Sequence, residues 1–194
     1  MTLVARTVTR GFVTAAALSA FALAVVVAAF PRSGRAEATG TPVYVTKIPA
    51  GYRDWKLVSV AQERGEINDI RAILGNEKAI KAFRAAKLPF PEGTIIARIA
   101  WEYLPSDENN KTFGDFAKSI GRNPPSEPQS FVAGHPKNGV QFMVKDSKKY
   151  AATGGWGYAQ FDDGKPADET VMKTCFPCHD LAKQRDAVFT RYAP

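Results

Sequence analysis

One five-residue motif near the end of the chain constrains the protein more than any other feature. Residues 175–179 read Cys-Phe-Pro-Cys-His and contain both cysteines of the chain and one of its two histidines. C-x-x-C-H is the attachment signature of a c-type haem. Two thiols at this spacing can each add to one vinyl group of the porphyrin, and the next residue is then held beneath the iron. The motif therefore predicts one covalently attached haem c, anchored by Cys175 and Cys178, with His179 as the metal ligand.

Three other uses of this cysteine pair suit the sequence less well. A thioredoxin-like C-x-x-C is expected near a βαβ pattern, whereas this motif lies close to the C-terminus after a polar stretch. Zinc needs four ligands, so the distant His135 would have to complete the set, and the adjacent Cys178 and His179 would share one small ion. A disulfide between Cys175 and Cys178 would close too short a loop to stabilise the fold much. The sequence therefore favours haem.

The first 38 residues have the pattern of a secretory signal. Arg6 and Arg10 precede an apolar run over residues 11–30, and Ala36-Glu37-Ala38 is a candidate cleavage site. We therefore expect a signal peptide over residues 1–38, a haem domain over residues 39–194 and a periplasmic location. Export agrees with the motif, because haem c is attached outside the cytoplasm. The apolar run is also long enough to stay uncleaved as a membrane anchor.

The charge of the mature chain narrows the choice of partners. Cleavage after Ala38 removes four of the 26 basic and one of the 19 acidic residues, so the formal net charge falls from +7 to +4. This charge suits an acidic redox partner or an anionic surface, and it identifies neither. The sequence has no basic stripe and no nucleic-acid-binding motif. Nucleic acid is therefore not an expected partner.

Hydrophobic periodicity predicts a sheet with a few helices. Strand patterns cover residues 55–60, 70–74, 94–103, 140–145 and 156–161, and helical patterns cover residues 77–87, 113–120 and 169–183. Residues 104–138 are polar and rich in proline, so a long loop is expected there, interrupted by the short helix at 113–120. The strands cluster without regular helical crossovers. This arrangement favours a single α+β domain built on a mostly antiparallel sheet.

The strand predicted at 94–103 has the clearest alternation of the chain. Side chains of alternate residues point to opposite faces of a sheet. Its apolar face carries Ile95, Ala97, Ile99, Trp101 and Tyr103, and its more polar face carries Thr94, Ile96, Arg98, Ala100 and Glu102. On the polar face, the Arg98 guanidinium could bind a haem propionate, which suits bidentate pairing. It could instead pair with Glu102 on the same face.

Several sequence blocks occur in a recognisable order. They are residues 52–55, 70–76, 92–96 and 144–150, the haem motif, and residues 188–192. In this order and spacing the chain resembles the cytochrome P-460 family along nearly all of its mature length. The resemblance implies a mostly antiparallel β domain, often a homodimer, with one haem whose iron is five-coordinate and open on the distal side. The type member oxidises hydroxylamine and the related cytochromes c-prime-beta bind nitric oxide, so the resemblance implies a small nitrogen-containing ligand.

The same resemblance assigns roles to three further residues. Arg71 matches a distal arginine that can hydrogen-bond a ligand on the iron. Arg98 stands where the type enzyme has a lysine cross-linked to the porphyrin, and a guanidinium stays protonated instead of acting as a nucleophile. Gln141 stands where the enzyme has a distal glutamate, and an amide cannot take up a proton as a carboxylate does. The sequence therefore leaves three functions open: oxidation of hydroxylamine or nitric oxide, non-catalytic gas binding, and electron transfer.

Electron transfer would require a sixth ligand to the iron. Met143, Met172 and His135 are conceivable ligands, although methionines at such positions usually serve packing. His135 lies in a Gly-His-Pro sequence, which predicts a surface turn. Aromatic residues that could line the haem, or form ordinary core, are Phe142, Trp156 and Phe189.

Overall fold

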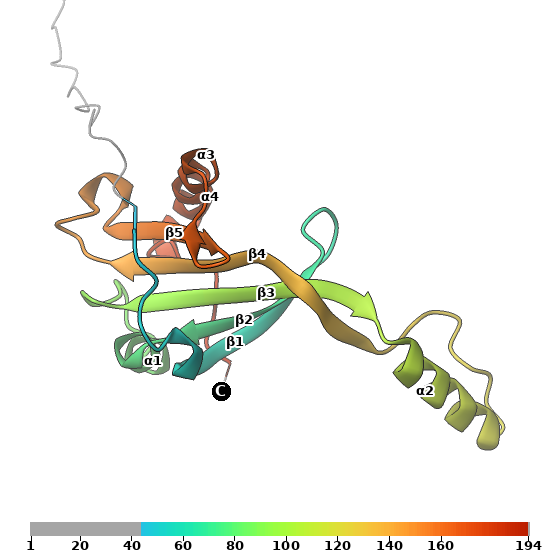
Figure 1. The fold of residues 1–194 in the computed structure, drawn as a ribbon. Helices are drawn as coiled ribbons and strands as arrows, with labels where there is room; N and C mark the ends of the chain where they lie inside the picture. The colour runs from blue at the N-terminus through green and yellow to red at the C-terminus, as the bar shows by residue number, and fades with distance from the viewer. Residues whose placement is uncertain (1–43, 194) are drawn as a thin grey trace, which may run out of the picture. The chain divides into compact units, whose positions relative to one another are not determined.

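The computed structural model describes residues 44–193, so the expected leader at 1–38 and its cleavage site lie outside the described residues. The described chain forms one antiparallel sheet of six strands, in the order β1-β2-β3-β4-β5-β6, with short helices around it (Figure 1). The expected α+β fold is confirmed. None of the helices between residues 44 and 193 combines the length and the apolar character that a membrane span requires.

The strands are β1 Lys56–Glu63, β2 Asp69–Gly75, β3 Ile95–Pro105, β4 Phe131–Lys145, β5 Trp156–Asp162 and β6 Lys165–Pro166. The helices are α1 Glu77–Arg84, α2 Asp107–Ser119, α3 Glu169–Lys173 and α4 Cys175–Asp180, with single 3-10 turns at η1 Tyr52–Asp54, η2 Ala151–Thr153 and η3 Lys183–Arg185.

The strand register fixes which side chains share a face of the sheet. Directly opposite residues in antiparallel strands point to the same side. Ile96 is paired with Met143, and Arg98 with Gln141. Ile96 and Arg98 therefore share a face, as the alternation of residues 94–103 predicts. We call this side the site face and the other side the back face. Further members of the site face are Ile73, opposite Arg98, Tyr158, opposite Met143, and Gln160, opposite Gln141.

The back face is covered by the segment that precedes the sheet. Val45 is buried there, and its backbone N–H donates to the Tyr158 carbonyl oxygen at 3.1 Å. The Tyr52 ring contacts Phe142 edge-on, with 5.2 Å between ring centroids. Ala97 of β3 is fully buried beneath this layer. The apolar side of β3 therefore gains its burial from residues 45–55, and not from an α-helix.

The site face carries α1 at one end. Asn76 caps this helix, because its side-chain oxygen accepts from the Ala79 N–H at 2.9 Å. The helix ends at Arg84, three residues earlier than the sequence predicts. The reason is a C-terminal turn in which Ala86 has φ of 47° and the Lys87 N–H donates back to the Ala82 carbonyl oxygen at 2.9 Å.

The prediction of a long loop over residues 104–138 is wrong for most of that range. Strand β3 continues to Pro105, helix α2 follows after a Ser106 cap, and β4 begins at Phe131. The two strands pair as far as Pro105 with Phe131, and the rings of Tyr103 and Phe131 stack with centroids 4.3 Å apart. The β3–β4 hairpin therefore extends past the other strands, and α2 lies at its far end (Figure 1).

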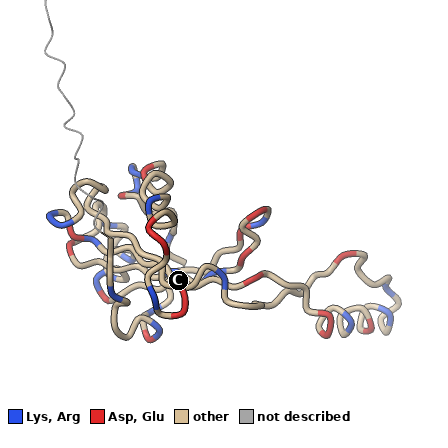
Figure 2. Tube along the Cα trace, turned by 45° about the horizontal axis from the view of Figure 1, so that its top comes forward, with Lys and Arg blue, Asp and Glu red and all other residues tan. Residues whose placement is uncertain are grey.

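Helix α2 is longer than the predicted 113–120 segment and has no buried residue. The apolar residues Phe113 and Phe116 of this helix, and Ile120 at its C-terminal cap, are all exposed. Charges of both signs follow the helix (Figure 2), and the Lys111 ammonium lies 2.7 Å from the Asp115 carboxylate. Because such exposed i,i+4 pairs stabilise a helix only slightly, the Ser106 cap and the hairpin beneath it define this element.

The Gly-His-Pro sequence lies inside strand β4 and not in a turn. Pro136 is placed opposite Trp101, where the pairing of β3 and β4 shifts register. Proline lacks an N–H and is tolerated in a strand at such an irregularity. His135 is exposed, as predicted.

Candidate functional site

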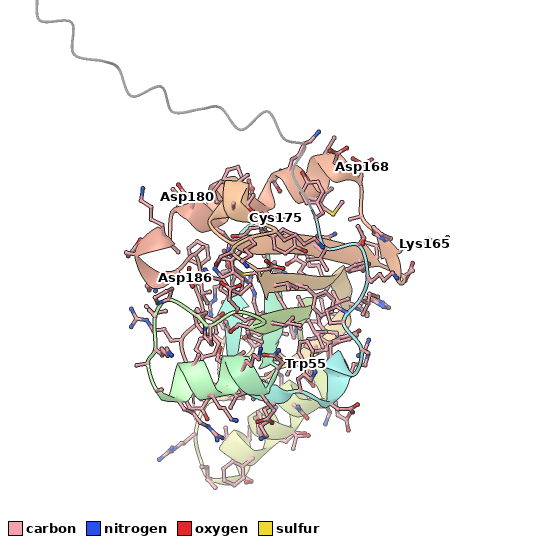
Figure 3. All side chains as sticks on the ribbon, turned by 90° about the vertical axis from the view of Figure 1, so that its left-hand side faces the viewer. Trp55, Lys165, Asp168, Cys175, Asp180 and Asp186 are labelled. Carbon is pink, nitrogen blue, oxygen red and sulfur yellow. The ribbon has the colours of Figure 1, made fainter. Side chains whose placement is uncertain are left out.

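The cysteines lie on two short helices that follow the sheet. Asp168 caps α3, accepting from the Thr170 N–H at 2.8 Å, and α4 follows after Thr174. The single helical stretch expected at 169–183 is therefore divided. Figure 3 labels Cys175 and Asp180 on this segment and Asp186 on the turn that follows it. Both thiols are free, with Cys175 half-buried and Cys178 exposed, and burial raises the pKa of the Cys175 thiol.

His179 is held by the backbone of the chain that follows it. Its Nδ1 lies 2.7 Å from the carbonyl oxygen of Ala187. A carbonyl oxygen only accepts hydrogen bonds, so Nδ1 carries the proton and Nε2 keeps its lone pair. Burial lowers the pKa of this imidazole, which favours the neutral form that binds a metal. The ring packs against Tyr158, at 5.1 Å between centroids, and Phe189, at 5.3 Å.

A charged group lies on the site face of β2 and β3. The Asp69 side chain is completely buried, and one of its oxygens accepts from Arg71 Nε at 2.8 Å and Nη2 at 2.5 Å. Its other oxygen accepts from Arg98 Nη2. Desolvation lowers the pKa of Arg98, and the neighbouring Arg71 charge lowers it further. Asp69 therefore holds two guanidiniums side by side, and both remain charged near neutral pH.

The hydrogen bonds continue across the next two strands. Arg98 Nη1 donates to Gln141 Oε1 at 2.9 Å, and Gln141 Nε2 donates to Gln160 Oε1 at 2.8 Å. The Gln160 amide then reaches both oxygens of Asp162 at 3.2 Å. Each amide accepts on one side and donates on the other, so the series is consistently oriented. We call Asp69, Arg71, Arg98, Gln141 and Gln160 the polar cluster.

Tyr158 links His179 to the polar cluster. Its side chain lies one step along β5 from that of Gln160 on the site face, and it contacts the His179 ring. The Tyr158 hydroxyl is buried and has no hydrogen-bond partner among the described residues. Burial also raises its pKa. A buried hydroxyl left unpaired destabilises a fold. This hydroxyl could therefore donate a hydrogen bond to a bound molecule.

These observations fit a haem. The two thiols are free, Nε2 of His179 keeps its lone pair, and the nearby Tyr158 hydroxyl lacks a partner. On the same segment Leu181 and Phe189 are apolar but 76% and 47% exposed. A macrocycle lying against this segment would remove such surface from water, which is favourable.

A comparison with protein families supports the same interpretation. The model of the family described as Cytochrome P460 matches residues 49–190. The chain belongs to the cytochrome P460 family. It is therefore a haem-binding cytochrome. A search of curated proteins found no match.

The P460 chain brings together the three residues to which the family resemblance assigns roles. Arg71, Arg98 and Gln141 are all members of the polar cluster, although they come from three strands. The alternative partner proposed for Arg98 is wrong, because the acid that binds it is Asp69 and not Glu102. The structure thus places these side chains on the site face, the same face on which the His179 ring packs against Tyr158.

The three aromatic residues that could line the haem lie in different surroundings. Phe142 lies in the back-face core beneath Tyr52, which agrees with the ordinary-core alternative and not with a wall of the haem. Trp156 is completely buried and packs on Phe90, with 5.8 Å between centroids. Phe189 touches the ring of His179. Of the three, Phe189 alone is partly exposed next to the motif, and it remains the candidate wall.

Several residues of the site were not predicted from the sequence. Asp69 directly precedes the strand predicted at 70–74, and its role depends on an arginine 29 positions away. Gln160 and Tyr158 could have been found from the alternation of β5, which places both on one face. The unpaired Tyr158 hydroxyl, in contrast, is visible only in three dimensions.

Proposed function

We propose that this P460-family protein is an exported mono-haem c-type cytochrome whose five-coordinate iron binds small nitrogen ligands such as nitric oxide. The observation that carries the proposal is the state of His179. Its Nδ1–H is engaged by the Ala187 carbonyl oxygen, so Nε2 is available to the iron, and the two thiols lie on the same short helix. A haem bound there would supply an iron that holds small ligands and exchanges single electrons.

In this proposal the polar cluster faces the ligand side. Two of its side chains, Arg71 and Arg98, offer the N–H groups of charged guanidiniums. The other two donors are the amide N–H groups of Gln141 and Gln160. Such donors stabilise partial negative charge on an oxygen of a bound ligand. Because Asp69 fixes both guanidiniums, the donors are held in place before a ligand arrives.

Binding is favoured over hydroxylamine oxidation, which requires groups that accept protons. The Asp69 carboxylate is already occupied by two guanidiniums, and Gln141 carries an amide that cannot act as a base. Arg98 cannot replace a nucleophilic lysine. We therefore propose capture or sensing of nitric oxide as the main function, and oxidation of hydroxylamine as the second candidate that the family resemblance keeps open.

Electron transfer through a six-coordinate haem is the least supported alternative. Met143 and Met172 are 9% and 8% exposed and pack within the protein. His135 lies on β4 in the part of the strand that pairs with the far end of β3. These placements agree with an iron that has no protein ligand on its distal side.

The test combines mass, spectrum and turnover of protein made with its leader in a periplasmic expression host. We expect the intact mass of a chain cut near Ala36 or Ala38 plus one haem. We also expect a high-spin ferrous spectrum that changes on addition of nitric oxide. A mass without haem, or a low-spin spectrum unaffected by nitric oxide, would reject the proposal. Hydroxylamine with an electron acceptor then separates the two candidates, since steady turnover would establish the enzyme.

A further inference from the structure

Lys145 belongs to a sequence block that the proposed function does not use, yet it is buried. It is the last residue of β4, its side chain is 6% exposed, and its ammonium lies 2.7 Å from Asp186 Oδ1. The ammonium also lies 5.0 Å from the centre of the Trp156 ring. Burying an ammonium is unfavourable unless it is paired. The ion pair with Asp186 is thus the main reason that Lys145 can occupy this position.

Asp186 connects three separate segments of the chain. Oδ1 binds the Lys145 ammonium, and Oδ2 accepts from the backbone N–H of Phe90 at 2.8 Å. Both oxygens of the carboxylate are therefore occupied by residues far away in the sequence. Together they fix the turn that carries Asp186 between η3 and the C-terminal tail.

That turn has an unusual backbone. Asp186 and Ala187 both have positive φ, 53° and 62°, and neither is glycine. Consecutive left-handed residues with side chains are unfavourable, and they persist only where surrounding contacts hold them. The Ala187 N–H also donates to the Ala182 carbonyl oxygen at 3.0 Å. The result is that the Ala187 carbonyl oxygen is directed at Nδ1 of His179, 2.7 Å away.

We propose that Lys145 and Asp186 are positioning residues that set the strength of the bond between His179 and the haem iron. The pair holds the turn, the turn aims the Ala187 carbonyl oxygen, and that oxygen accepts the Nδ1–H bond. A firm hydrogen bond at Nδ1 raises the basicity of a ligating imidazole and fixes its ring orientation. A more basic imidazole favours the ferric iron. The inference rests on the proposed role of His179 as the axial ligand.

The proposal is tested by weakening the pair without touching His179. Asp186→Asn removes the charge, while asparagine tolerates positive φ and its side-chain oxygen can still accept from Phe90. Lys145→Met removes the ammonium and keeps the apolar stem. Phe161→Leu is the matched control, because it disturbs a side chain that is 2% exposed in the back-face core, away from the pair.

Three readouts on the haem-loaded protein are compared. Resonance Raman gives the iron–histidine stretching frequency of the ferrous form, redox titration gives the midpoint potential, and proton NMR gives the exchange of the His179 Nδ1 proton with water. In both pair variants we expect a lower frequency, a higher potential and faster exchange than in the unaltered protein. The control should lower the melting temperature and leave all three readouts unchanged.

The outcomes separate the proposal from the function on which it rests. If the unaltered protein shows no iron–histidine mode, His179 is not the ligand, and both ideas are rejected. If the mode is present but unmoved in Asp186→Asn, the positioning role alone is rejected. Asp186→Asn decides the question even if Lys145→Met does not fold, because it preserves the shape of the turn.

Discussion

Replacing Asp69 with asparagine should destabilise the protein strongly. The substitution preserves shape but removes the negative charge that holds Arg71 and Arg98 together. Two guanidiniums, each 16% exposed, would then face each other without their shared carboxylate. Removing one partner of a buried ion pair destabilises by about 3–5 kcal/mol. The partial exposure of the arginines lets water relieve some of this, so we expect about 3 kcal/mol.

A matched substitution gives the scale for this effect. Glu63 also pairs with Arg71, at 2.7 Å, but its side chain is 49% exposed. Exposed ion pairs contribute about 0–1 kcal/mol, so Glu63→Gln should have little effect. For a domain of this size about 1 kcal/mol corresponds to about 2–4 °C in melting temperature. Asp69→Asn should therefore lower the melting temperature by about 6–12 °C, and Glu63→Gln by less than about 4 °C.

The assay is thermal and urea unfolding of the haem-loaded protein, followed by far-ultraviolet circular dichroism. Arg98→Met is made both in the unaltered protein and in Asp69→Asn, which completes a double-mutant cycle. We expect Arg98→Met to be less damaging once Asp69 is already asparagine, with a coupling energy of about 1–3 kcal/mol. Equal stability of Asp69→Asn and Glu63→Gln would refute the claim that Asp69 organises the polar cluster. Strictly additive effects of Asp69→Asn and Arg98→Met would refute it as well.

Three further predictions follow from other parts of the molecule. Met143→Leu should leave the ferric spectrum unchanged, and a change from low-spin to high-spin would identify Met143 as a sixth ligand. Peptide mass spectrometry should find the haem bonded to the 175–179 peptide alone; a haem peptide that also carries the strand of Arg98 would contradict this. Hydrogen bonds from Ser147 hold the pKa of Glu92 below its usual 4.5. They should therefore stabilise the fold above about pH 4.5 and lose this effect as the pH falls further. Ser147→Ala should lower the melting temperature at pH 7 but not near pH 3, and equal losses at both would argue against it.

The elements that the sequence predicted well are those whose pattern is set locally. The alternation of β3 assigned both faces of that strand correctly, and the helical pattern began at residue 77, where α1 begins. Helix α2 was underestimated because its side chains are mostly polar and it buries none of them, so it lacks the apolar periodicity that marks a packed helix. The early part of β4 resembled a turn because Pro136 is tolerated only through an irregularity in pairing.

The candidate site was predictable only in part, for a related reason. The spacing of the C-x-x-C-H motif is a local signal, so it could be found by inspection. The contacts around it join residues 29 positions apart, as for Asp69 and Arg98, or 41 apart, as for Lys145 and Asp186. Neither acid lies in a pattern that indicates its partner. Burial of both pairs depends on the complete fold, which local propensity does not encode.

The strictly sequential order of the sheet has a consequence for how the protein assembles. Each strand pairs with the strand that precedes it in the chain, so the sheet can grow by successive hairpins whose loops close at little entropic cost. The C-terminal tail then returns to the first strand, where the Ala193 N–H donates to the Val58 carbonyl oxygen of β1 at 2.9 Å. The thiols lie between the last strand and this closing contact. The chain can thus complete its sheet before the segment that carries the cysteines docks, so both thiols stay accessible until the tail packs against β1.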